Sequence, residues 1–345
     1  MSEQEMSIGL NACCMYATEE GVWFVQGMMP ILYFYSYKEN QVTFAKAISI
    51  GKNYGTAYFS SIYISENELY LIPNNYNAIV IYDLEKDSFL YYRVNGDGTN
   101  SYRENYEKDG FLYCVPYKSK DMLIIDLKSK DFEYIPLGTK CVNSTCRYGD
   151  IIYCVEWETN QIILFDMKSR EKHIKTLEGE YKFCSIVIGE KNVYLYDTKT
   201  KCLYSFDHRL EEKQTSVSIG FEHTILILDK EQNIIIDSTC SDKQVSLIDG
   251  ELKEIKIERS SKLLDNTPWK MCCWSKNDRL ICITPYGQLI FWDDEICVRD
   301  LSINRQWYEK LNQLLIKESD NEIIHERELF SLKDFIGVLI VGVKK

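Results

Sequence analysis

The sequence predicts an all-β fold, a seven-bladed β-propeller of four-stranded antiparallel blades followed by a short helical C-terminal extension. Two observations carry this prediction. An aromatic or aliphatic residue followed by Asp and a short polar turn recurs at intervals of about 40 to 47 residues. Each interval also contains several short, apolar, alternating runs separated by turn residues, which is typical of β-strands. A period of this length with several strands in every unit is characteristic of propellers.

The repeated phrase ends a strand and begins a turn in each unit. Its polar anchors are Ser36, Asp83, Asp126, Asp166, Asp207, Asp249 and Asp293. An Asp side chain in this position can accept hydrogen bonds from backbone N–H groups two residues further on. We therefore expect these carboxylates to stabilise turns rather than to take part in chemistry.

The second unit shows how one blade is built. Its expected strands are residues 60–65, 68–73, 78–82 and 88–94, separated by polar turns. The second strand of each unit is almost continuously apolar, which fits a strand covered by neighbours on both faces. We expect a propeller domain at residues 1–303, with blades at 10–48, 58–94, 103–137, 144–177, 182–219, 221–258 and 269–303.

The pattern changes after the seventh unit. Apolar residues then follow helical spacing, at Trp307, Leu311, Leu314 and Leu315. This stripe predicts a helix from about Arg305 to Glu318. The apolar segment from Phe335 to Val343 would also need a covering surface. Residues 304–345 are thus interpreted either as a cap on the propeller or as an assembly element that docks on a partner.

The repeats resemble kelch-type and quinoprotein-type propeller repeats, in which an aromatic-Asp pair precedes a short turn and an outer strand. The resemblance covers about residues 10–303. The chain lacks the Gly-Gly pair that kelch units carry, and only Phe291-Trp292-Asp293 echoes the ending of a WD repeat. The resemblance implies the architecture and transfers no functional residue.

Composition limits the classes of partner. The chain has 345 residues, a formal charge of −12 and a pI near 5.0, which argue against nucleic-acid binding and against an anionic membrane surface. No apolar run is long enough to span a bilayer, and residues 1–6 do not resemble a secretory signal. Thirteen cysteines without a Cys-x-x-Cys motif predict reduced, mostly buried thiols. We expect a protein of the bacterial cytoplasm with no cofactor and no metal.

Candidate functional residues lie in loops around the central channel. We expect the links into the inner strands and the loops between second and third strands to carry function. The predicted ligand contacts are Tyr58, Tyr102, Arg103, Tyr181, Lys182, Trp269 and Lys270. The second set of loops adds Asn74, Asn75, Tyr76, Tyr117, Lys118, Trp157, Glu158 and Tyr286. Aromatic rings would stack on a ligand and cations would pair with its carboxylates or phosphates. Alternatively, the rings close the core and the cations are solvated.

The predicted function is non-catalytic recognition of a protein, peptide or glycan. The alternative is a propeller enzyme, a hydrolase, lyase or epimerase acting on a sugar or small ester in the central channel. Its acid–base groups would start from Glu222 and His223, the best candidates in the chain. A third interpretation is a purely structural subunit whose loops are covered by the C-terminal extension or by a neighbour.

Overall fold

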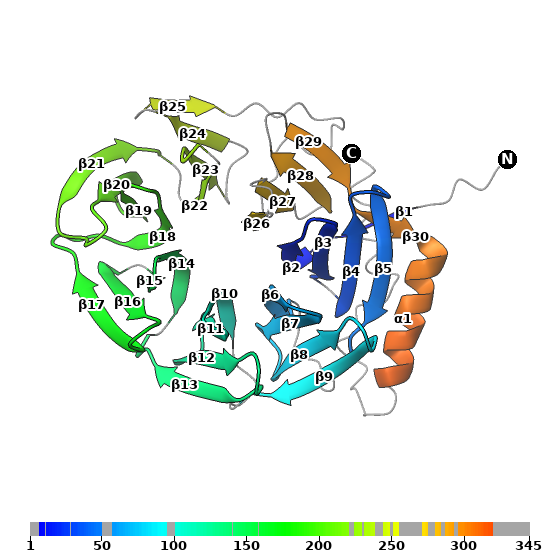
Figure 1. The fold of residues 1–345 in the computed structure, drawn as a ribbon. Helices are drawn as coiled ribbons and strands as arrows, with labels where there is room; N and C mark the ends of the chain where they lie inside the picture. Colours follow the sequence, from blue (N-terminus) through cyan, green and yellow to red (C-terminus); the bar gives the residue numbers. More distant parts are fainter. Residues whose placement is uncertain are drawn as a thin grey trace.

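The computed structural model describes fifteen stretches of the chain. They are residues 7–10, 12–27, 29–49, 57–94, 101–139, 141–157, 159–220, 224–229, 231–238, 244–248, 251–254, 271–274, 280–283, 287–292 and 296–319. Seven four-stranded antiparallel sheets stand around a central axis, and in each sheet the strands follow chain order (Figure 1). The seven-bladed propeller predicted from the repeats is confirmed.

The first four blades are formed by consecutive segments of the chain. Blade one contains β2 (Ala12–Ala17), β3 (Gly21–Gln26), β4 (Ile31–Ser36) and β5 (Gln41–Ala47). Blade two contains β6 (Phe59–Ser65), β7 (Glu68–Pro73), β8 (Ala78–Asp83) and β9 (Ser88–Arg93). Blade three contains β10 (Tyr102–Lys108), β11 (Phe111–Pro116), β12 (Asp121–Asp126) and β13 (Phe132–Pro136). Blade four contains β14 (Val142–Tyr148), β15 (Ile151–Glu156), β16 (Gln161–Asp166) and β17 (Glu171–Thr176).

The remaining three blades complete the circle. Blade five contains β18 (Phe183–Ile188), β19 (Val193–Asp197), β20 (Cys202–Phe206) and β21 (Lys213–Ser218). Blade six contains β22 (Thr224–Leu228), β23 (Ile234–Ser238), β24 (Gln244–Ile248) and β25 (Glu251–Glu254). Blade seven contains β26 (Met271–Trp274), β27 (Leu280–Ile283), β28 (Gln288–Trp292) and β29 (Ile296–Asp300).

The core is divided into clusters between neighbouring blades. Between blades two and three, Ile72 and Ile79 of one sheet pack against Leu112 and Leu123 of the other. Every residue of β8 is buried, because blades one and three cover its two faces. This arrangement explains the near-continuous apolarity of the middle strands, which have no solvent-facing side.

A short ladder and a helix close the ring between blades seven and one. β1 (Ser7–Gly9) pairs antiparallel with β30 (Ser302–Asn304), and α1 (Arg305–Ser319) lies against β5 (Figure 1). Tyr308 and Leu311 are buried in the cluster that joins the two blades. A Cβ atom at Gly287 would lie 2.1 Å from the Leu10 carbonyl oxygen, so the close approach of blade seven to the segment before blade one requires glycine there.

The predicted helix is confirmed, but its apolar stripe differs from the expected one. Leu311 is buried, whereas Leu314 is 51% exposed. The buried face therefore covers less of the helix than the spacing suggested. The apolar segment 335–343 lies outside the described residues, and a role of residues 304–345 in assembly stays a prediction. Among the residues that the structure describes, no helix is both long and apolar enough to cross a bilayer.

We call the two ends of the propeller the turn face and the loop face. The turn face carries the turns between first and second strands and between third and fourth strands. The loop face carries the links between blades and the loops between second and third strands. On the turn face, Asp126 Oδ1 accepts hydrogen bonds from the backbone N–H groups of Lys128 (2.8 Å) and Ser129 (3.0 Å). These bonds hold the pKa of Asp126 below its usual range.

The same turn recurs in neighbouring blades. Asp83 and Asp166 also accept two backbone N–H bonds each, as the repeated phrase predicted. Four residues after each anchor the backbone turns into the left-handed region, with φ between 51° and 67° at Asn40, Asp87, Lys130 and Arg170. The aspartates are therefore structural parts of the turns.

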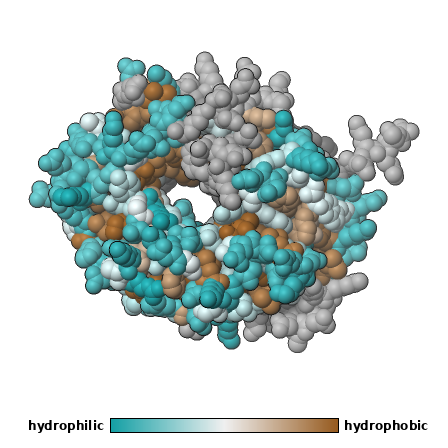
Figure 2. Space-filling view, viewed as in Figure 1, coloured by the Kyte–Doolittle hydropathy of each residue, from teal (hydrophilic) through white to brown (hydrophobic). Residues whose placement is uncertain are grey.

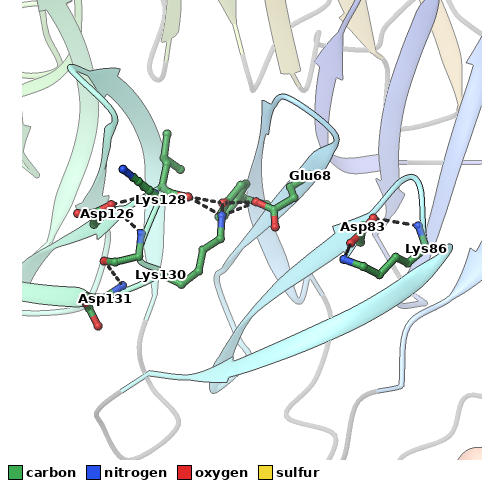
Figure 3. A network of polar contacts seen from close by, with 10 residues as sticks. Glu68, Asp83, Lys86, Asp126, Lys128, Lys130 and Asp131 are labelled. Atoms are coloured by element: carbon green, nitrogen blue, oxygen red, sulfur yellow. Dashed lines mark hydrogen bonds and ion pairs between the residues drawn. The ribbon is translucent and has the colours of Figure 1, made fainter.

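Tyrosine hydroxyls join the turns of one blade to the second strand of the blade before it. Tyr113 donates to the Met167 carbonyl and Tyr153 donates to the His208 carbonyl, both at 2.8 Å. Burial raises the pKa of Tyr153 to about 12. In Figure 3, Lys130 extends from the Asp126 turn of blade three to Glu68 of blade two, with which it forms an ion pair. These contacts connect neighbouring blades.

A candidate binding surface on the loop face

A repeated backbone hydrogen bond organises the loop face in blades two to five. In each, a carbonyl in the link before the inner strand accepts the N–H of the residue sixteen positions later, in the loop between second and third strands. The pairs are Tyr58 with Asn74 (2.8 Å), Ser101 with Tyr117 (2.7 Å), Cys141 with Trp157 (3.0 Å) and Lys182 with Thr198 (3.0 Å). The four loop residues thus occupy equivalent positions. Their sixteen-residue spacing is the sequence signal that could have aligned them.

A hollow of about 1030 Å³ opens on the loop face between blades four and five. Its walls come from the links into blades four and five, from the loops between the second and third strands of these blades, and from the start of β16. The residues are Gly138, Cys141, Glu156, Trp157, Thr159, Asn160, Gln161, Gly179, Glu180, Tyr181, Lys182 and Lys199. In the view of Figure 2, the rim of the ring is mostly hydrophilic and hydrophobic residues gather toward the central opening.

Buried polar groups hold the walls of the hollow in place. Asp197 is 0% exposed, and its Oδ1 accepts the backbone N–H of Lys182 (2.7 Å) and of Lys199 (3.2 Å). Its Oδ2 accepts the Thr200 N–H (3.2 Å) and hydroxyl (2.6 Å). One carboxylate therefore ties the link into blade five to the loop between β19 and β20, so the two lysines keep fixed backbone positions.

The other wall is tied by an amide. Asn160 Nδ2 donates to the carbonyls of Leu177 (2.9 Å) and Gly179 (3.1 Å), which connects the blade-four loop to the link. Gly179 has φ near +123°, and a Cβ atom there would lie 2.9 Å from the Tyr181 ring. Glycine is therefore required where the link turns beside this ring.

Two aromatic side chains are presented in the hollow. The Trp157 side chain is 40% exposed although its backbone is hydrogen-bonded. The half-buried ring of Tyr181 stacks on Phe183, with centroids 4.9 Å apart and planes 22° apart. It also meets Tyr204 edge-on at 5.1 Å. Phe183 and Tyr204 thus hold the Tyr181 ring in place. Trp157 and Tyr181 together offer amphipathic surface that loses little side-chain entropy when a ligand binds.

The predicted ligand contacts that the structure describes fall into three groups. Tyr58 and Tyr102 are only 2% and 1% exposed and lie in inter-blade clusters, so their rings are not available for stacking on a ligand. Burial accordingly raises the pKa of Tyr102 strongly. Tyr181 and Lys182 line the same hollow. Arg103 lies one blade away, beside Tyr117.

Six candidate residues lie outside the described part of the chain. Trp269 and Lys270 are predicted ligand contacts, and Glu222 and His223 are the basis of the enzymatic alternative. The other two are Glu158 and Tyr286, from the loops between second and third strands. Within the described ranges, no three His, Cys, Asp or Glu side chains are grouped closely enough to hold a metal ion.

Comparison with known proteins identifies the fold. No family model matches the sequence, and no curated protein matches it. The chain is similar in structure to a catalytically inactive virginiamycin B lyase from Staphylococcus aureus with quinupristin, with a TM-score of 0.65 and 11% identity over 82% of this chain and 97% of the lyase. It is equally similar to YCF48 bound to D1 peptide, with a TM-score of 0.65 and 9% identity over 87% and 96% of the two chains.

A third similar structure is a chain of the mitotic checkpoint complex. Its TM-score is 0.59 and its identity 14%, over 86% of this chain and 91% of that one. At such low identity these likenesses establish the propeller fold alone, because enzymes and binding proteins both occur among them. The kelch or quinoprotein subtype stays a prediction.

Proposed function

We propose that this protein is a non-catalytic recognition module that binds a peptide segment of a protein partner in the hollow between blades four and five. The observation that carries the proposal is that the exposed Trp157 and the half-buried Tyr181 line one hollow, on segments whose backbones are fixed by Asp197 and Asn160. A preformed site loses little conformational entropy on binding. Exposed aromatic side chains in such sites are frequent energetic hot spots.

The size of the hollow favours a peptide over a small metabolite. Its volume of about 1030 Å³ is at the upper limit of small-molecule pockets, which range from about 300 to 1,000 Å³. The hollow also reaches the links of two blades, so an extended chain can cross it. The propeller of YCF48 bound to D1 peptide supports the proposal as an example of peptide binding by this fold.

Selection from a random dodecapeptide display library tests the proposal. We expect peptides that bind the wild-type protein and lose at least tenfold in affinity for Trp157→Ala, which is about 1.4 kcal/mol. The matched control is Tyr148→Ala, which removes a similarly exposed ring (44%) from the turn face and should leave binding unchanged.

The two variants must first show thermal stability equal to that of the wild type. Selection of no peptide would refute the proposed function. Peptides that bind Trp157→Ala as tightly as the wild type would refute the hollow as the site.

A further inference from the structure

A cluster of two cations and a ring lies on the loop face beside the hollow. The Arg103 guanidinium carbon is 5.4 Å from the centroid of the Tyr117 ring, and Lys118 Nζ is also 5.4 Å from it. Arg103 belongs to β10, whereas Tyr117 and Lys118 belong to the loop between β11 and β12. Both positive charges thus lie over the ring of one aromatic side chain, where cation–π attraction stabilises them.

These two cations of blade three differ from the cations that bridge neighbouring blades. Lys46 pairs with Asp87 and Lys108 with Asp150, at 2.6 and 3.0 Å. Arg170 likewise pairs with a carboxylate of the preceding blade. Among the described residues, no carboxylate lies within ion-pair distance of Arg103 or Lys118. In a chain of net charge −12, Arg103 and Lys118 thus form a local pair of positive charges, and the carboxylate of the neighbouring Glu104 interacts electrostatically with Arg103.

The cluster is continuous with the hollow through the link to blade four. The Tyr117 carbonyl accepts the Val142 N–H (3.0 Å), and the Cys141 carbonyl accepts the Trp157 N–H (3.0 Å). Burial raises the pKa of the Cys141 thiol, and the positive charges of Arg103 and Lys118 oppose that rise. Cys141 lines the hollow, so the two cations lie at its blade-three end.

Lys182 and Lys199 lie at the blade-five end of the hollow, where Glu180 forms an ion pair with Lys199. Glu156 pairs with Val142 beside Cys141, and its negative charge raises the pKa of the Cys141 thiol, which Arg103 and Lys118 lower. Arg103 and Lys118 form no ion pair with a described carboxylate, so an anionic group can bind them without displacing one.

We propose that Arg103 and Lys118 bind carboxylates of an acidic peptide segment whose apolar side chain packs on Trp157. This inference rests on the proposed function and adds the chemical class of the ligand and its orientation. The guanidinium can bind a carboxylate through two parallel N–H···O bonds, and Lys118 supplies a second positive charge. The acidic remainder of the surface repels such a peptide, so local attraction gives the site its selectivity.

Charge reversal tests the inference with the same random dodecapeptide library. We expect the wild type to enrich peptides that combine Asp or Glu with an aromatic residue, and Arg103→Glu/Lys118→Glu to lose these peptides at least tenfold. The reversed variant should instead enrich peptides that contain Lys or Arg. The control is Lys128→Glu/Lys168→Glu, which makes the same charge change at two exposed lysines of the turn face and should enrich the wild-type peptides.

The outcomes separate this inference from the proposed function. Enrichment of neutral or basic peptides that depend on Trp157 would refute the acidic class and leave peptide binding in place. Acidic peptides that bind the reversed variant as tightly as the wild type would refute Arg103 and Lys118 as their contacts. Selection of no peptide would refute both statements.

Discussion

The turn face and the loop face are built on the same repeat but use it differently. On the turn face, successive blades place the same type of side chain at equivalent positions. Asp126 and Asp166 cap equivalent turns, and the Tyr113 and Tyr153 hydroxyls donate equivalent hydrogen bonds to the next blade. On the loop face the backbone bond repeats but the side chain changes, from Asn74 and Tyr117 to Trp157 and Thr198. Repeated side chains support the ring on the turn face, whereas varied side chains on a repeated backbone form the proposed binding surface of the loop face.

The largest loss of stability is expected at Asp197, the buried carboxylate that connects two segments of the loop face. Asp197→Ala would leave the N–H groups of Lys182, Lys199 and Thr200 without their acceptor. We expect the free energy of unfolding to fall by about 3 kcal/mol, since buried donors without partners cost about 1–3 kcal/mol each and some regain water. Urea denaturation measures this loss, and selected peptides should also bind more weakly.

Asp126→Ala provides the comparison from the turn face. Its two donors lie in an exposed turn, where water replaces the carboxylate, so the loss should be clearly smaller than for Asp197→Ala. Equal losses at the two positions would contradict the difference drawn between the faces.

A smaller loss of stability is expected when one of the tyrosine hydrogen bonds between blades is removed. Tyr153→Phe removes the bond to the His208 carbonyl and should lower the free energy of unfolding by about 1 kcal/mol. The pKa of Tyr153 in the folded protein is about 12, above its ordinary value near 10. The folded state therefore retains this proton longer than the unfolded state, and stability should fall as the pH rises from about 10 to about 12.

Urea denaturation of Tyr153→Phe and the wild type across that pH range checks this dependence. The variant should lose stability less steeply than the wild type, because it lacks the titrating hydroxyl. The same slope in both proteins would show that Tyr153 does not contribute.

The smallest effect should be a gain in stability on the turn face. Glu66 is exposed and has φ near +52°, which is unfavourable for a residue with a side chain. Glu66→Gly should raise the free energy of unfolding by about 0.5 kcal/mol, because relief of strain exceeds the added chain entropy. Thermal denaturation checks whether the variant is more stable than the wild type. The matched control is Glu85→Gly, at a residue without positive φ, which should not stabilise the protein.

The propeller could be predicted from the sequence because each repeat contains residues whose structural role depends only on their immediate neighbours. An Asp that caps a turn needs only the next few residues, so the phrase around Asp83 or Asp166 is readable without a structure. The exposure of side chains on the loop face was harder to predict from the sequence. The choice of Tyr102 as a ligand contact failed to anticipate that its ring is buried, whereas the neighbouring Arg103 is partly exposed.

An irregularity at the start of the inner strands of blades one to five explains this difficulty. The register shifts between Phe59 and Ser61, and equivalent shifts occur at the starts of β10, β14 and β18. Such bulges change the direction of the side chains that follow, so simple alternation does not tell which residue faces the core. The hollow itself depends on how two links and two loops meet, and that information is spread over the chain.

The ladder between β1 and β30 has a consequence for synthesis of the protein. Ser7 pairs with Asn304, so the ring cannot close until nearly all of the described chain has left the ribosome. Blades two to five can pack successively against neighbours already made, but the outer flank of blade one has no partner during that time. Its apolar residues, including Val22 and Phe24, are covered only when blade seven and Tyr308 arrive. The first blade to be translated is therefore the last to be enclosed.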